Sequence, residues 1–181
     1  MIDSHCHLYF DTIRKNIDDI ILNSKKHKIK TLLSINTDPS EFNDHLNLIS
    51  KFNNIYISYG LHPNSVNENT NFTFEEIINN SKNDKVIGIG ETGLDFYYSN
   101  DFKDRQFEIF RTHIEASIET KLPIIIHQRH SEDEIIDIIN SYKNYNFPVL
   151  FHCFTGSKKL LKFCLDNNFY ISLSGIVTFK N

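Results

Sequence analysis

Two histidines stand two positions apart near the start of the chain, in the run Asp3-Ser4-His5-Cys6-His7. In an extended strand, residues i and i+2 face the same side, so the imidazoles of His5 and His7 would point together and Cys6 would point away. Paired imidazoles are good ligands for Zn, Mn or Fe. A short HxH pattern also arises by chance at the edge of a strand, so this motif alone leaves both interpretations open.

Three further potential ligands, Glu91, His127 and His152, each follow an apolar run. The Glu91 carboxylate could bridge two ions, although in isolation its glycine-rich surroundings also fit a turn with a solvated acid. A lone histidine on an apolar strand is more often a core residue than a ligand. Four histidines and a glutamate, all expected at strand ends, are harder to explain as core residues, and together they predict a metal site.

A fifth histidine, His62, lies in Gly60-Leu61-His62-Pro63 after another apolar run. Its imidazole could hold a substrate phosphate or assist proton transfer. A histidine in a turn braced by Pro63 is the alternative interpretation.

These residues need a scaffold that brings several strand ends together, and the apolar pattern provides one. Short runs rich in Ile, Val, Leu and Tyr alternate with amphipathic segments, which is typical of buried parallel strands connected by helices. The predicted strands span residues 1–3, 31–35, 55–59, 86–89, 123–126, 149–151 and 170–173. Capping patterns at Asp38, Thr73 and Ser131 predict three helix starts.

Strands that alternate with helices indicate an α/β protein, which could be an open doubly wound sheet or a closed barrel. Polar residues at the C-terminal end of strand after strand favour the TIM (β/α)8-type barrel, where active sites lie at that face. About seven strands are recognisable, so the predicted barrel is incomplete and lacks its eighth strand. We predict one domain over residues 1–181.

Charge and cysteine content restrict the possible partners and location. The formal net charge is −4, which disfavours a wide footprint on duplex DNA and indicates that any contact with nucleic acid is local. Three cysteines without paired spacing are typical of a reducing compartment. Neither a signal peptide nor a membrane-spanning run is recognisable, so we predict a cytoplasmic protein without membrane contact.

Taken together, the motifs resemble the TatD family of metal-dependent deoxyribonucleases, within the amidohydrolase-like barrels. The matching stretches are DSHCHL (3–8), GLHP (60–63), GETGLDFYY (90–98), RQFEIFRTHIEAS (105–117), LPIIIHQR (122–129), HCFTGS (152–157) and SLSGIVTFKN (172–181). They run from end to end in family order. HxH alone is common to many metallohydrolases, whereas its combination with GETGLD and HCFTG is specific.

The resemblance implies a centre of two divalent ions (Mg, Mn or Zn). One ion would be bound by His5 and His7 and the other by His127 and His152, with Glu91 bridging the two. Imidazole ligands suit Mn or Zn better than Mg.

The resemblance also implies residues that meet the substrate, namely His62, Asp95 and Arg129 near its phosphate. Glu91 and His62 are the predicted catalytic residues. The implied activity is that of a 3′–5′ exodeoxyribonuclease acting on single-stranded DNA or on 3′ ends, and no obligate protein partner is inferred.

Two rival hypotheses remain. The family pattern has a final aspartate after an eighth strand, whereas this sequence ends at Asn181 after the seventh, so the chain could be a truncated and catalytically impaired remnant. Alternatively, it could be a barrel hydrolase acting on a small-molecule ester or amide. A carbamylated lysine on a middle strand would favour that class, but the middle-strand residue here is Glu91.

Overall fold

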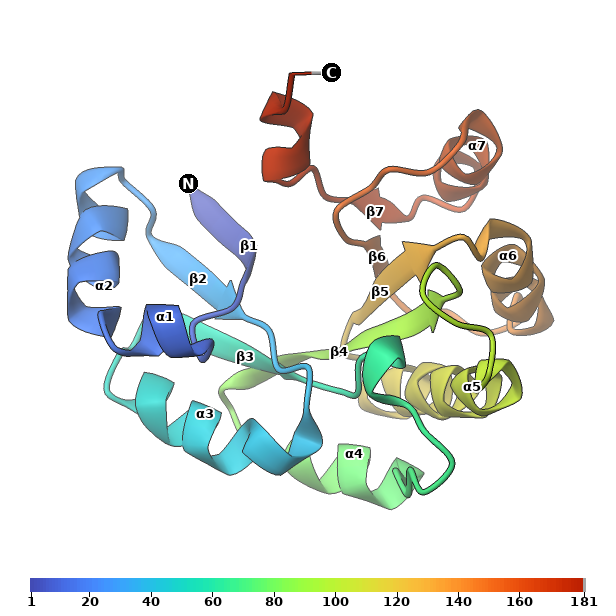
Figure 1. The fold of residues 1–181 in the computed structure, drawn as a ribbon, viewed down its shortest axis with the longest axis horizontal. Helices are drawn as coiled ribbons and strands as arrows, with labels where there is room; N and C mark the ends of the chain where they lie inside the picture. The colour runs from blue at the N-terminus through green and yellow to red at the C-terminus, as the bar shows by residue number, and fades with distance from the viewer. Residues whose placement is uncertain (181) are drawn as a thin grey trace.

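A computed structural model describes residues 1–180 and shows one parallel sheet with its strands in chain order (Figure 1). The strands are β1 (Ile2–Cys6), β2 (Thr31–Ser34), β3 (Ile55–Tyr59), β4 (Val86–Asp95), β5 (Ile124–Arg129), β6 (Val149–Phe151) and β7 (Tyr170–Ile171). Each strand pairs with the next in parallel. The predicted seven-stranded α/β architecture is confirmed.

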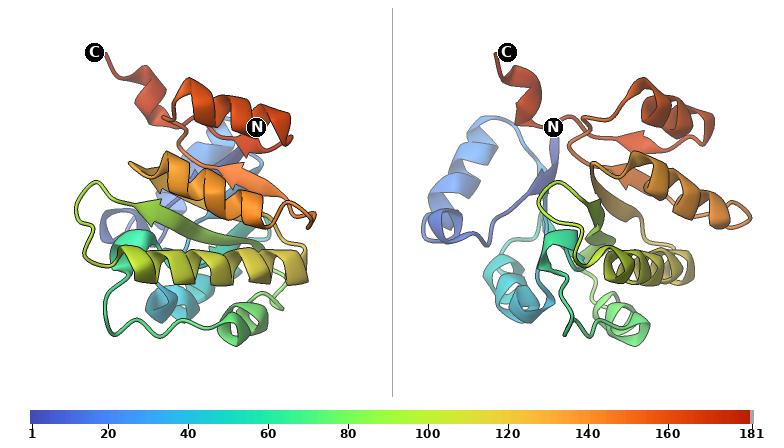
Figure 2. Two further views of the ribbon diagram at one scale, coloured as in Figure 1. Left: turned by 90° about the vertical axis from the view of Figure 1, so that its right-hand side faces the viewer. Right: turned by 45° about the vertical axis from the view of Figure 1, so that its right-hand side comes forward.

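Helices connect the strands and lie around the outside of the sheet (Figures 1 and 2). The α-helices are α1 (Asp11–Arg14), α2 (Ile17–Lys26), α3 (Phe42–Ser50), α4 (Phe74–Asn80), α5 (Lys103–Thr120), α6 (Glu132–Ser141) and α7 (Lys158–Asp166). Short 3₁₀ turns are η1 (Pro39–Glu41), η2 (Pro63–Ser65) and η3 (Gly175–Thr178). The sheet curls into part of a barrel, and within residues 1–180 its first and last strands do not pair.

The three isoleucines of β5 show how the strands divide the core. Ile124 and Ile126 pack outward in the cluster that includes residues of the surrounding helices. Ile125 faces inward, where it packs with Leu33 and Ile35. Because strand side chains alternate, His127 shares the inward direction of Ile125 and lies on the barrel side of the sheet.

Strand β4 departs from simple alternation, and this departure aims Glu91 at the site. Ile89 packs outward toward helices, so strict alternation would turn Glu91 outward as well. The register with β5 shifts between Ile89 and Thr92, and Leu94 again packs outward. Such an irregularity re-aims the following side chains, which turns Glu91 and Asp95 inward. The strand therefore continues to Asp95, beyond its predicted end at residue 89.

Two of the three predicted helix caps are present. Thr73 accepts a hydrogen bond from the Glu76 amide at 3.2 Å, and Asp38 accepts one from the Ser40 amide at 2.8 Å. The helix start predicted at Ser131 is confirmed, because α6 begins at Glu132, but the Ser131 hydroxyl does not cap the helix and instead donates to the Leu94 carbonyl at 2.8 Å. Ser131 is buried, and a buried carbonyl without a partner would cost more than a missing cap.

Candidate metal centre

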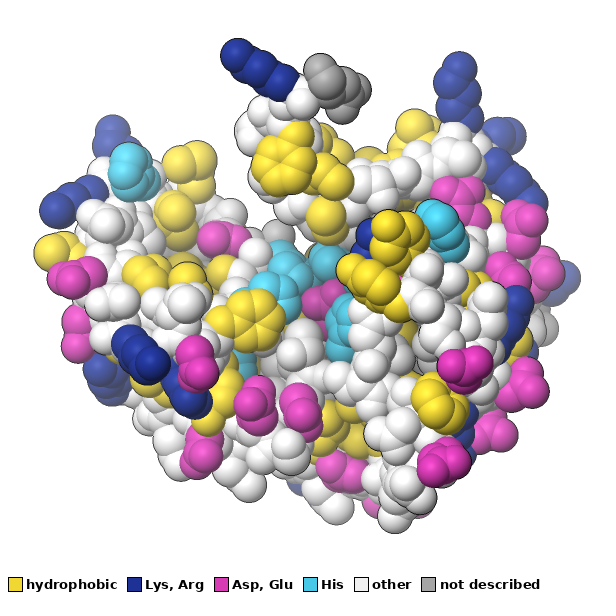
Figure 3. All heavy atoms as spheres, viewed as in Figure 1, with side chains coloured by type: hydrophobic (Ala, Val, Ile, Leu, Met, Phe, Trp, Pro, Cys, Tyr) yellow, Lys and Arg dark blue, Asp and Glu magenta, His cyan; other side chains and the backbone are white. Residues whose placement is uncertain are grey.

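Histidine and carboxylate side chains converge at the C-terminal edge of the sheet. Glu91 comes from β4, His5 from β1 and His127 from β5. His152 directly follows β6, and His62 lies three residues after the end of β3. The space-filling view shows His and acidic side chains in a hollow on this face, with hydrophobic side chains on both sides (Figure 3). The folded chain thus brings together residues separated by up to most of its length.

Glu91 is the hub of this cluster. Its Oε1 lies 2.6 Å from His152 Nε2, 3.1 Å from His127 Nδ1 and 3.3 Å from His62 Nε2, and its Oε2 lies 3.3 Å from His5 Nε2. Burial alone would raise the pKa of Glu91, but hydrogen bonds from these imidazoles hold it well below its usual range. Glu91 is therefore a carboxylate, although its side chain is buried.

His127 is held from its far side by Asp95. The Asp95 carboxylate accepts from His127 Nε2 at 3.0 Å, which leaves Nδ1 to face Glu91. Burial lowers the pKa of His127, but hydrogen bonds with Asp95 and Glu91 outweigh it and raise this pKa to about 9. A metal-binding histidine characteristically donates a hydrogen bond from the N–H of its second ring nitrogen to a carboxylate, so this arrangement suits His127 as a metal ligand.

His5 and His7 present buried nitrogens without hydrogen-bond partners. Nδ1 of His5 and Nδ1 of His7 are in this state, and Nε2 of His5 has only the Glu91 carboxylate nearby, at 3.3 Å. Burial, together with the nearby His5 and His152, outweighs the opposing effect of Glu91 and lowers the pKa of His7 to about 4. The His7 ring is therefore neutral, and buried polar atoms without partners, as in His5 and His7, require an explanation.

His62 is arranged differently from the other imidazoles. The Asn64 amide donates to His62 Nδ1 at 3.1 Å, so the neutral ring carries its proton on Nε2. That Nε2 faces Glu91. His62 is thus set up to donate a hydrogen bond into the site.

The donor set fits a divalent cation. His127 Nδ1 and His152 Nε2 lie 3.3 Å apart, and both lie beside Oε1 of Glu91. The lone pairs of these three atoms would repel one another unless a proton or a cation lies between them. His5, Glu91 and His152 form one group with ligand atoms close enough for an ion, and His62, Glu91 and His127 form another. The first group places His152 with His5 around one ion, whereas the ligand assignment implied by the family resemblance places His152 with His127. His7 belongs to neither compact group.

Arg129 lies at the rim and not in the cluster. Its guanidinium carbon lies 3.5 Å from the centre of the Tyr97 ring, and its Nη1 donates to the Tyr98 hydroxyl at 3.2 Å. Contact with a substrate phosphate at Arg129 stays a prediction.

Two contributions to the site were missed in the sequence. One is the bond from Asp95 to His127, which depends on the pairing of Asp95 with Arg129 across β4 and β5. The other is Phe10, whose ring stacks on His7 with centroids 4.6 Å apart. An aromatic residue three positions after the HxH motif was the available signal for Phe10.

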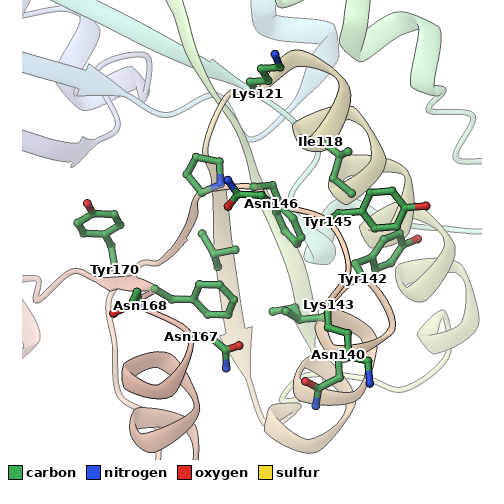
Figure 4. Close-up of a pocket in the computed structure, with 15 residues that line it drawn as sticks. Ile118, Lys121, Asn140, Tyr142, Lys143, Tyr145, Asn146, Asn167, Asn168 and Tyr170 are labelled. Carbon is green, nitrogen blue, oxygen red and sulfur yellow. The ribbon is translucent and has the colours of Figure 1, made fainter.

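The cavity of about 830 Å³ shown in Figure 4 lies at the opposite end of the strands. It is bounded by the ends of α5 and α6 and by the segment leading into β7, and Tyr142, Tyr145 and Tyr170 are among its lining residues. None of the predicted site residues lines it, so the chemistry belongs to the other edge.

Comparisons with known proteins place the chain in a family. The family model described as TatD related DNase matches residues 2–181. A protein of Buchnera aphidicola subsp. Baizongia pistaciae, called an uncharacterized metal-dependent hydrolase, is 39% identical over 184 residues, which cover 100% of this chain and 69% of that protein. The 3′-5′ ssDNA/RNA exonuclease TatD of Salmonella typhimurium is 25% identical and is covered to 68%, with 98% of this chain.

The fold has a close counterpart among solved structures. The crystal structure of YJJV, a TatD homologue from Escherichia coli K12, aligns with a TM-score of 0.89 at 21% identity and covers 99% of this chain and 70% of that one. No helix within residues 1–180 is long and apolar enough to cross a membrane.

A curled parallel β/α sheet with a histidine and carboxylate centre at its C-terminal edge, together with these relatives, defines a metal-dependent hydrolase. The chain belongs to the TatD related DNase family.

Proposed function

We propose that this protein hydrolyses phosphodiester bonds of single-stranded DNA, removing nucleotides from the 3′ end with the help of divalent metal ions. The observation that carries the proposal is the convergence of four imidazoles on the buried Glu91 carboxylate. The relative called an ssDNA/RNA exonuclease supports the choice of substrate.

In this proposal Glu91 would help to hold two ions, one together with His5 and His7 and the other together with His127 and His152. When bound, such ions neutralise phosphate charge and lower the pKa of a water molecule. Manganese or zinc suits these ligands better than magnesium.

The remaining polar residues act on the substrate or on the ligands. His62 donates its Nε2 proton in a hydrogen bond to a phosphate oxygen, because Asn64 fixes the ring in that tautomer. Asp95, predicted as a substrate contact, is proposed here to hold His127 in its binding orientation. Arg129 lies at the rim, outside the cluster of metal ligands, and its guanidinium binds the phosphate of a neighbouring nucleotide.

The test is digestion of 5′-labelled single-stranded DNA by the purified chain with Mg, Mn or EDTA. We expect shortening from the 3′ end that requires metal and falls by about three powers of ten in Glu91→Gln, because several kcal/mol of charge stabilisation depend on the bound ions. Glu119→Gln is the matched control, since Glu119 is exposed on α5.

Cleavage that persists in EDTA, or that Glu91→Gln leaves intact, would contradict the proposal. Turnover of a cyclic amide or a carboxylic ester without any DNA cleavage would replace it with the small-molecule hypothesis. Both substrates are therefore assayed beside the oligonucleotide.

A further inference from the structure

Two exposed aromatic side chains stand on either side of the centre, and their surroundings suggest a use for them. We infer that Phe10 and Tyr98 form a stacking groove that holds two consecutive nucleobases, one against each ring, with the phosphate between them at the centre. This inference rests on the proposed function and deepens it, because it assigns where the bases of the substrate bind.

Phe10 provides the first wall. One face of its ring lies almost parallel to His7, with an interplanar angle of 2°, and the side chain is still 51% exposed. A cavity of about 250 Å³ opens beside it. Its lining residues are His7, Phe10, Thr37, His62, Ser65 and Glu91. A base in this cavity would therefore have the ring of Phe10 as a wall and the centre within reach.

Tyr98 provides the second wall. Its side chain is 70% exposed, and its hydroxyl accepts a hydrogen bond from Arg129, whose guanidinium also packs over the Tyr97 ring. The guanidinium carbon also lies 5.0 Å from the centre of the Tyr98 ring, so these contacts hold the ring at the rim while most of it stays exposed. A cavity of about 350 Å³ beside Tyr98 reaches Asp95, the partner of His127.

The turn η2 links the two cavities. Ser65 lines the cavity beside Phe10, and Pro63 and Asn64 line the cavity beside Tyr98. His62 caps this turn and points its Nε2 at Glu91. A nucleic-acid strand passing over η2 would thus place a phosphate at His62 and one base on each side.

The charge distribution favours stacking over phosphate contacts as the source of affinity. No lysine or arginine lines either of these cavities or the third cavity at the centre, which lies between the β1 and β7 segments within residues 1–180. The chain also carries a net charge of −4. Stacking on an aromatic ring contributes about 1–3 kcal/mol per base and tolerates any sequence, so it can bind a strand where cations are scarce.

The test compares Phe10→Ala and Tyr98→Ala on a normal oligonucleotide and on one whose last two sugars lack bases. We expect each variant to raise KM about tenfold on the normal substrate and to change kcat little, within the roughly 5- to 150-fold range that one stacked base provides. On the abasic substrate the variants and the wild type should behave alike. Phe10→Tyr and Tyr98→Phe keep the rings, so their KM should lie closer to that of the wild type than to that of the alanine variants.

Tyr145→Ala is the matched control. Tyr145 is 58% exposed and lines the cavity at the opposite end of the strands, so its loss removes an exposed ring without touching the groove. An equal rise in KM in this control, or equal losses on normal and abasic substrates, would overturn the inference.

A binding measurement separates the inference from the proposed function. Two oligonucleotides carry 2-aminopurine at the last or at the penultimate position, and each probe loses fluorescence when its modified base stacks. We expect wild-type protein to quench both probes, and each alanine variant to quench one of the two less, whether or not the strand is cleaved. Quenching without cleavage would remove the proposed function and keep the groove, whereas equal quenching by wild type and variants would remove the groove.

Discussion

The hydrogen bond from His127 to Asp95 determines which nitrogen of that imidazole faces the centre. Asp95→Asn keeps the shape of the side chain but removes its negative charge, which weakens or abolishes the hydrogen bond that it accepts from His127. We expect the affinity for Mn or Zn to fall about 10- to 100-fold, as for other residues that orient a metal ligand. Titration calorimetry on metal-free protein measures this.

Asp84→Asn is the control for that experiment, because Asp84 is exposed in the turn before β4. Unchanged metal affinity in Asp95→Asn would show that the carboxylate does not orient His127, and it would return Asp95 to its predicted role at the substrate.

A second buried histidine, His113 on α5, supports the loop that carries His62. Its Nε2 accepts from the Leu61 amide at 3.1 Å, and its Nδ1 donates to the Ile109 carbonyl at 2.7 Å. Burial lowers the pKa of His113 from 6.5 to about 4, although the bond to Ile109 opposes this. The ring is therefore neutral in the folded chain at neutral pH.

This predicts a loss of stability in acid. Below pH 6.5 the unfolded chain takes up a proton at His113 that the folded chain does not, so the free energy of unfolding falls as the pH drops from 6.5 toward 4. The contribution of this one site is roughly 3 kcal/mol at the lower end. Urea unfolding across this pH range should show a shallower decline in His113→Gln than in wild type, and parallel curves would exclude His113 as a cause.

At the residue scale, the sequence revealed which side chains gather but not how they face. His5 was predicted from its spacing with His7, and His127 and His152 from their places after apolar runs; the structure brings all three to Glu91. The tautomer of His62 could not be predicted, because it depends on a backbone amide in a turn. Distance along the chain also hid the bond between Asp95 and His127.

At the scale of elements, the glycines of β4 allow the site to form. Gly93 has a φ of +136°, and a Cβ there would lie 2.1 Å from the His127 carbonyl oxygen. Gly93→Ala should therefore destabilise the fold by roughly 2–5 kcal/mol, from backbone strain together with overpacking. The midpoint of urea unfolding measures this loss.

Gly175→Ala is the matched control, because nothing lies within 4 Å of a Cβ at that position. We expect its unfolding midpoint to match that of wild type. A Gly93→Ala protein as stable as this control would show that β4 and β5 can separate at this point at little cost.

The same strand shows what an apolar sequence pattern cannot predict. The apolar run 86–89 predicted the start of β4, but the strand continues through six further residues to Asp95. Pairing with β5 makes this continuation possible, and no local pattern records that pairing. Strict alternation from Ile89 would have turned the Glu91 side chain toward the helices. The motif predicted Glu91 as a ligand, but only the register shift explains why its side chain faces the site.

At the scale of the whole molecule, the centre and the stability of the sheet should be coupled. A ligand that binds only the folded state stabilises it, by about 2.7 kcal/mol at 100 times its Kd. If the ions bind as proposed, Mn or Zn at that excess should raise Tm by roughly 5–10 °C, and EDTA should reverse the rise. Scanning calorimetry of wild type and Glu91→Gln measures this, and equal shifts in the two proteins would place the binding elsewhere.

The strand order β1 to β7 leaves the two edge strands unpaired with each other within residues 1–180, yet His5 lies on β1 and His152 follows β6. The rings of these two histidines stack 4.1 Å apart. The backbone hydrogen bonds therefore run around an arc, and the side chains at its open end meet across the gap. If the ions bind as proposed, one at His5 and the other at His152, Glu91 would link them and thereby join the two ends of this arc by coordination. The curvature of the whole sheet would then respond to metal binding.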